Sequence, residues 1–298
     1  PRLRVELGDL GGESDCHKSL GTAFIRLHNT TKAIASFERC LQIQSQLSNN
    51  KGVVDALISL GLAHFKAGHN LQASVERLEQ ALYLFKQLPP EDAAASSGRA
   101  VCLDHLGNVY SKMGKAEMAV AHYSKSLLAK RDIKDTTGEA RCLVRIGLEY
   151  LSLSRLEEAF DHFREALLLF ENLDDDNGIA ICHENLGDTY MKMGEIREAI
   201  ASYEQCLPIK MDTWDRVGEA QCLDNLGLAH YSLGELAVAA EYYEQSLAIW
   251  KAEGEEHALM TCCESLGGVC FHMGEHLRSI ECYVQFLTLS QHVGDGAS

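Results

Sequence analysis

The sequence predicts an all-α protein built from about seven tandem helix-turn-helix repeats. Two observations predict this class: a Leu-Gly pair that returns at a nearly constant spacing, and apolar residues at helical intervals around it. The repeat glycines, one of which follows isoleucine instead of leucine, are Gly21, Gly61, Gly107, Gly147, Gly187, Gly227 and Gly267. Their spacing is 40 residues except for one interval of 46. Such a period is typical of stacked repeats, in which each unit packs only on its neighbours.

Composition agrees with a folded helical chain. Of its 298 residues, 46% are apolar and only four are prolines. No run of about 18 apolar residues predicts a membrane span. The formal charge of −16 disfavours a nucleic-acid partner, since phosphate contacts need clustered Lys and Arg. The same charge favours a basic or mixed-charge protein partner.

Residues 138–177 illustrate one repeat. Helix A opens at Gly138, after Asp135 as an N-cap candidate, and its apolar residues follow at helical spacing. Gly147 lies in the middle of this helix, where glycine costs about 1 kcal/mol relative to alanine. Because this glycine returns in every repeat, we expect another helix to approach its backbone closely. After a short turn at 153–155, helix B begins near Leu156.

The other repeats follow this template. The turn between helices A and B is marked by Gly68, Gly114, Gly194, Gly234 and Gly274, with His28 and Ser154 as substitutes. Helix B carries an aromatic residue at one position: Phe37, Tyr123, Phe163, Tyr203, Tyr243 and Tyr283. The longer interval is explained by one residue inserted near the A–B turn of the second repeat and five within 88–97. We expect residues 88–97 to form a longer loop, or alternatively a hinge or docking site.

The cysteines indicate packing rather than disulfides or zinc. Six of the eleven stand five residues before a repeat glycine: Cys16, Cys102, Cys142, Cys182, Cys222 and Cys262. The second repeat has Ala56 there, so the position fits a small buried side chain. Cysteines on successive repeats lie about 8–10 Å or more apart, beyond disulfide reach. An odd count without a paired framework favours a reducing compartment, so we expect a cytoplasmic protein.

One segment carries a complete signature: Leu106-Gly107-Asn108-Val109-Tyr110, then Gly114, Ala119, Tyr123 and Leu127. This pattern resembles the tetratricopeptide repeat (TPR) family. The 40-residue period, with Gly-Glu-Ala at 138–140 and 218–220, is similar to the long-helix subclass of the mitotic Leu-Gly-Asn repeat adaptors. The resemblance implies a right-handed superhelical solenoid.

Repeat boundaries follow from the same pattern. We expect a seven-repeat domain over 12–298, with repeats at about 12–51, 52–97, 98–137, 138–177, 178–217, 218–257 and 258–298. Residues 1–11 look like the end of a preceding helix B, and 293–295 reach the place where another helix A would begin. We therefore expect a fragment of a longer array.

The resemblance also implies that the A helices line a concave groove that holds a peptide. Groove-facing positions are expected three and two residues before, and one and five after, each repeat glycine. The candidates, with Arg141 one turn earlier, are Asp104, His105, Asn108, Lys112, Arg141, Arg145, Glu184, Asn185, Asp188, Lys192, Asp224, Asn225 and Glu264. Asn185 and Asn225 are the strongest, because an amide can both donate to and accept from a peptide backbone. Mixed charges along the groove predict a partner of mixed or basic charge.

The expected function is that of a non-enzymatic adaptor or scaffold that binds a peptide or a helix of another protein in its groove, without catalytic residues, cofactor or metal. No phosphate loop, nucleophile elbow or HExxH motif is present. A structural or self-associating spacer is the alternative. A metal-dependent enzyme is a remote one, because the A–B turn at Gly274 separates the residues of the last repeat that could bind zinc: Cys262, Cys263, Cys270, His272 and His276.

Overall fold

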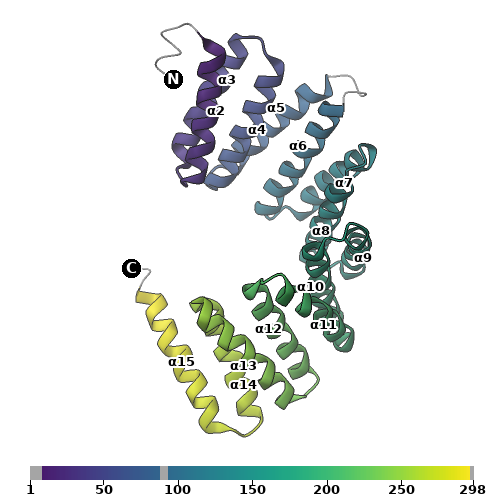
Figure 1. The fold of residues 1–298 in the computed structure, drawn as a ribbon, viewed down its shortest axis with the longest axis vertical. Helices are drawn as coiled ribbons and strands as arrows, with labels where there is room; N and C mark the ends of the chain where they lie inside the picture. The colour runs from purple at the N-terminus through teal and green to yellow at the C-terminus, as the bar shows by residue number, and fades with distance from the viewer. Residues whose placement is uncertain (1–8, 88–92, 296–298) are drawn as a thin grey trace. The chain divides into compact units, whose positions relative to one another are not determined.

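A computed structural model describes residues 9–87 and 93–295, which form fourteen α-helices and no strand (Figure 1). The predicted all-α class, built from tandem helix pairs, is confirmed. The A helices are α2 (Leu10–Arg26), α4 (Asn50–Ala67), α6 (Ala93–Lys112), α8 (Thr136–Ser152), α10 (Asp176–Met193), α12 (Arg216–Ser232) and α14 (Glu256–His272). The B helices are α3 (Thr30–Gln46), α5 (Leu71–Lys86), α7 (Ala116–Asp132), α9 (Leu156–Asn172), α11 (Ile196–Asp212), α13 (Leu236–Glu253) and α15 (His276–Asp295).

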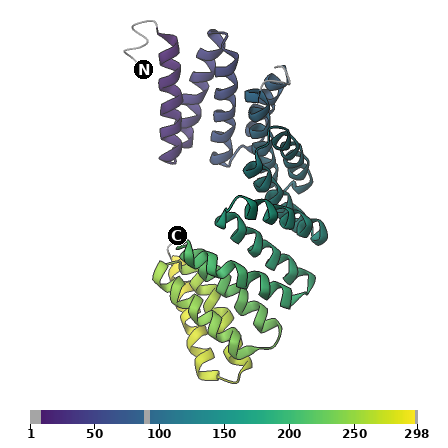
Figure 2. The ribbon, with the colours of Figure 1, turned by 45° about the vertical axis from the view of Figure 1, so that its right-hand side comes forward.

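The helices fall into two compact units, 1–154 and 155–298. The first unit holds α2 to α8 and the second holds α9 to α15. Within each unit every helix packs against the next one in the chain, as two views show (Figures 1 and 2). This is the nearest-neighbour packing expected of a repeat array.

The turns lie where the sequence predicts them. The seventh residue after each repeat glycine has a left-handed backbone, from φ 82° at Gly194 to φ 56° at His28 and 58° at Ser154. Glycine is favoured there because a Cβ atom makes this conformation costly. Four A helices, α2, α8, α10 and α12, begin after an aspartate N-cap: Asp135 Oδ1, for example, accepts the backbone N–H of Gly138 at 2.9 Å.

The aromatic ring of helix B packs directly on the repeat glycine of helix A. A Cβ atom at Gly107 would lie 2.4 Å from Cε1 of Tyr123, and one at Gly187 would lie 2.4 Å from Cε1 of Tyr203. Real Cβ atoms do not approach other atoms so closely, so glycine lets the ring lie against the backbone of helix A. The expected packing reason for this glycine is confirmed at these sites.

The cysteine column is confirmed as a packing position in the second to seventh repeats, whereas Cys16 of the first repeat is only half-buried. Cys102, Cys142 and Cys182 are fully buried, as is Ala56 in the second repeat. All eleven cysteines carry free thiols. Burial raises the pKa of Cys102 to about 12, which keeps that thiol protonated and unreactive at neutral pH.

Three expected boundaries differ from the structure. Helix α6 begins at Ala93, so 93–97 extend a helix instead of a loop, because alanine has the highest helix propensity; residues 88–92 lie outside the described part. Helix α2 begins at Leu10, after the N-cap Asp9, which places 10–11 in the first A helix, and 1–8 lie outside the described residues. Helix α15 continues through 293–295.

The single inserted residue of the second repeat is His69, between the turn residue Gly68 and the N-cap Asn70.

Replacing Gly187 with alanine tests the glycine contact. We expect G187A to lower the free energy of unfolding by about 1–3 kcal/mol, because the new methyl overpacks against Tyr203. G268A is the matched control: it also lies inside an A helix, but its Cβ would meet nothing closer than the Tyr283 hydroxyl at 3.7 Å. Urea unfolding followed by circular dichroism should show no loss for G268A. Equal losses in both variants would contradict the contact.

Candidate functional site

Four positions of each A helix are exposed or half-buried on one face in the third to sixth repeats. They lie six and two residues before the repeat glycine and one and five after it, a spacing that puts them on one helix face. We call this set the A stripe. In the first unit it comprises Val101, His105, Asn108 and Lys112 of α6 and Arg141, Arg145, Leu148 and Ser152 of α8. In the second unit it comprises Ile181, Asn185, Asp188 and Lys192 of α10 and Gln221, Asn225, Leu228 and Ser232 of α12.

Most predicted groove residues lie on this stripe, and four do not. Those on the stripe are His105, Asn108, Lys112, Arg141, Arg145, Asn185, Asp188, Lys192 and Asn225. The four acidic residues three positions before the glycine are Asp104, Glu184, Asp224 and Glu264. Glu264 is exposed on α14, whereas the other three are partly buried.

Asp104 points back into the repeat. Its carboxylate forms an ion pair with Lys130, which is 6% exposed, and accepts a hydrogen bond from Cys142 Sγ at 3.1 Å. Burial alone would raise the pKa of Asp104, but hydrogen bonds from Lys130, Cys142 and Ser126 outweigh it and lower the pKa. Asp104 therefore fastens α6 to α7 and to the next A helix.

Asp224 has a similar inward role. It accepts hydrogen bonds from the Ser246 hydroxyl and from Trp250 Nε1, the latter at 2.8 Å. Burial raises the pKa of Asp224 in spite of these bonds. Burial also raises the pKa of Glu184, against the opposing charge of Lys210.

The position after the glycine is fixed by the same aromatic residue that packs on the glycine. Tyr123 donates to Asn108 Oδ1 at 2.7 Å, and Tyr203 donates to Asp188 Oδ1 at 2.6 Å. Arg145 lies above Tyr123, with its Cζ 5.9 Å from the ring centroid. These contacts orient one edge of the A stripe.

The two asparagines singled out by sequence are half-buried on the stripe. Asn185 Nδ2 donates to the carbonyl of Ile181, one turn earlier, at 2.7 Å. The Asn225 side chain makes no hydrogen bond within the described part of the chain. Binding of a peptide backbone by these amides stays a prediction.

The predicted groove-facing positions include Leu148 and Leu228, one residue after the glycine, but not Val101 and Ile181, which lie six residues before it. Val101, Leu148, Ile181 and Leu228 are 40%, 44%, 41% and 48% exposed. A period of two repeats would have revealed Val101 and Ile181, since Val101 returns as Ile181 80 residues later, just as Leu148 returns as Leu228. Lys112 and Lys192, and Ser152 and Ser232, follow the same period. The aliphatic, lysine and serine positions of the stripe therefore recur in both units, whereas the other four positions differ.

A hollow of about 520 Å³ adjoins the stripe in the first unit. Leu148 and Ser152 of α8 line one side of it, and Ser111 and Gly114 line the other at the end of α6. A side chain from a ligand could enter here beside an exposed leucine.

Among the described residues, no three His, Cys, Asp or Glu side chains come together as a metal site would require. In the last repeat Cys262 and Cys263 are buried, and His272 Nδ1 lies 2.9 Å from the Gly268 carbonyl oxygen. None of the described helices is long and apolar enough to cross a membrane.

Removing Asp104 should destabilise the fold, because Lys130 would remain buried without a counter-charge. We expect D104A to lose about 3–5 kcal/mol of unfolding free energy, and D104A/K130M to recover much of it. Since the folded pKa of Asp104 lies below its unfolded value, this stabilisation is present above the unfolded pKa and is lost as pH falls through the folded one. Urea unfolding as a function of pH measures both effects. A D104A variant as stable as wild type would refute the inward role.

Family models match most of the chain. Four models described as tetratricopeptide repeat match residues 98–172 and 146–212, 220–253, 58–109 and 19–47. Together they cover more than half of the sequence. No curated protein sequence matches the chain.

Solved structures show the same fold at low sequence identity. A Signal Transduction ATPase with Numerous Domains from Pyrococcus horikoshii, with a tetratricopeptide repeat sensor, matches with TM-score 0.80 and 14% identity over 97% of this chain and 44% of that one. The apo form of RapI matches with TM-score 0.70 and 15% identity over 95% and 99%. The Rap conjugation gene regulator of plasmid pLS20, solved with the Phr* peptide, matches with TM-score 0.54 and 19% identity over 96% and 76%.

The period, the glycine contact and the family matches agree. The chain belongs to the tetratricopeptide repeat family.

Proposed function

We propose that the chain is a non-enzymatic interaction scaffold that binds peptide segments of partner proteins on the A stripe. One observation carries this proposal: exposed aliphatic side chains lie among amides and cations at matching places in both units. An apolar centre with a polar rim is the usual composition of a binding surface.

Energetics favour a partner that uses both units. A fully buried leucine contributes about 1.5–3 kcal/mol, and Leu148 and Leu228 are already half-buried, so each adds about 1 kcal/mol on binding. One unit alone therefore supports modest affinity. A partner with two suitable segments would gain avidity from the second contact.

Charge refines the proposed partner. In the first unit the stripe carries Lys112, Arg141 and Arg145, whereas in the second it carries Asp188 and Lys192. A mixed-charge segment, with acidic residues against the first unit, fits this distribution. The net charge of −16 disfavours nucleic acid, and a cytoplasmic setting stays a prediction from cysteine usage.

One comparison supports peptide binding on this fold. A Rap regulator of similar fold was solved in complex with a peptide. The 40-residue period supports the further proposal that the chain is similar to the Leu-Gly-Asn repeat adaptors. The alternative of a self-associating spacer stays a prediction.

The leucines provide the sharpest test. Peptides are first selected from a random display library on the full chain, and their affinities are then measured for variants. We expect L148S/L228S to weaken the selected peptides by about fivefold or more, as the lost apolar contact predicts. L128S/L168S is the matched control, since Leu128 and Leu168 are 60% and 57% exposed on B helices. Equal effects of both pairs, or no enriched peptide, would count against the A stripe.

The asparagines are tested in the same assay. We expect N185A/N225A to reduce affinity for selected peptides while the thermal melting curve stays within about 2 °C of wild type, since neither amide bonds to another helix. If this variant unfolds, or if its affinity for the selected peptides is unchanged, the assignment of Asn185 and Asn225 to the binding site is wrong.

A further inference from the structure

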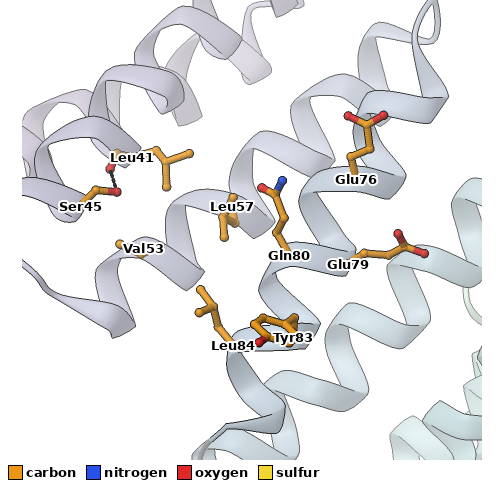
Figure 3. Close-up of a pocket in the computed structure, with 9 residues that line it drawn as sticks. All are labelled: Leu41, Ser45, Val53, Leu57, Glu76, Glu79, Gln80, Tyr83 and Leu84. Atoms are coloured by element: carbon orange, nitrogen blue, oxygen red, sulfur yellow. Dashed lines mark hydrogen bonds between the residues drawn. The ribbon is translucent and has the colours of Figure 1, made fainter.

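A second hollow lies on the B-helix side of the first unit. It measures about 620 Å³ and opens between α3 and α5, over α4 (Figure 3). We call it the B groove. Its lining consists of Leu41 and Ser45 of α3, Val53 and Leu57 of α4, and Glu76, Glu79, Gln80, Tyr83 and Leu84 of α5. None of these residues belongs to the A stripe.

The floor of the B groove is apolar. Leu57 is buried, and Leu41, Val53 and Leu84 are half-buried around it. Tyr83 stands at one end with 64% of its surface exposed. A large exposed aromatic beside half-buried aliphatic side chains is the composition of an anchor site for a partner side chain.

The rim of the groove is acidic. Glu76 and Glu79 are exposed along the α5 wall, and neither forms an ion pair within the described residues. Gln80 accepts a hydrogen bond from Arg77 at 3.3 Å, and no Lys or Arg lines the groove. Glu76 and Glu79 are three residues apart on one helix face, where like charges repel each other. A cationic ligand would relieve that repulsion.

The neighbouring hollow shows the opposite charge. It measures about 460 Å³, lies between α5 and α7, and has Lys86, Arg99 and Lys125 in its lining. Glu79 and Tyr83 line both hollows, so α5 separates an acidic groove from a basic one. The acidity of the B groove is therefore local and does not merely reflect the net charge of the chain.

The shape of the groove favours a helix. Glu76, Glu79, Gln80 and Tyr83 follow one another at i, i+3, i+4 and i+7, so the wall extends for two helical turns, about 10 Å. The opposite wall is another helix, α3. Two helical walls over an apolar floor match the helix-in-groove mode of recognition.

We propose that the B groove binds an amphipathic helix of a partner protein whose apolar face is flanked by Lys or Arg. Its apolar side chains lie on Leu41, Leu57 and Leu84 and against Tyr83, and its cations pair with Glu76 and Glu79. This site is independent of peptide binding on the A stripe.

A designed peptide of about 18 residues, five turns, serves as the probe. It carries leucines at i, i+3, i+4 and i+7 and lysines elsewhere, with a fluorescent label for anisotropy measurements on the full chain. Two companions share its length: one replaces every lysine with glutamate, and one scrambles the order so that no apolar face forms. We expect the basic amphipathic peptide to bind about tenfold more tightly than either companion, and its affinity to fall as salt rises.

Variants locate the contact. We expect E76K/E79K to weaken the basic peptide by about tenfold, and Y83A to weaken it by about fivefold. E117K/D132K, two exposed carboxylates of α7 in the same unit, makes the same change in net charge and should weaken it by less than about twofold. L148S/L228S should leave this binding unchanged, which separates it from the A stripe. Equal losses in both charge-reversal variants, or equal binding of the acidic or scrambled peptide, would overturn the proposal.

Discussion

The close contact between the repeat glycine of helix A and the aromatic ring of helix B is the interaction on which the other features depend. Tyr123 and Tyr203 lie so near Gly107 and Gly187 that a Cβ atom at either glycine would force the ring to shift. This contact fixes how the two helices of a repeat are rotated relative to each other. It thereby decides which positions of helix A face inward, as the cysteine column does, and which form the exposed A stripe.

The same register places the polar side chains. Asp104 forms an ion pair with Lys130, and Asp224 accepts a hydrogen bond from Trp250. Each partner lies 26 residues later on helix B, so both carboxylates hold helices together instead of facing a ligand. Asn108 and Asp188 accept from the tyrosines that cover the glycines. What remains at the surface of the A helices is the set of aliphatic, amide and cationic side chains that we propose as the binding surface.

The sequence predicts the structural features that follow from the pattern within one repeat. It does not predict the contacts that depend on which residues two helices or two repeats bring together. The turn glycines, the buried cysteines and the helix pairs follow from a 40-residue period alone. The inward direction of Asp104 does not, because it depends on which residue helix B offers 26 positions later. The B groove was equally invisible, since Leu41 and Tyr83 belong to different repeats. The insertion within 88–97 predicts a loop, but the helix propensity of the alanines at 93–95 extends α6 back to Ala93.

The central claim is that peptide ligands bind the A stripe, the face of the A helices that the packing of helix B on the repeat glycine leaves exposed. Site-specific photo-crosslinking tests this claim most directly. A photoreactive amino acid is placed at Ser152 or Ser232 on the A stripe, or at the exposed control positions Leu128 of α7 and Ala248 of α13. Each labelled chain is then irradiated with a display-selected peptide. We predict crosslinks from Ser152 and Ser232 and none from the two controls. Crosslinks from Leu128 or Ala248, with none from the stripe, would contradict the account.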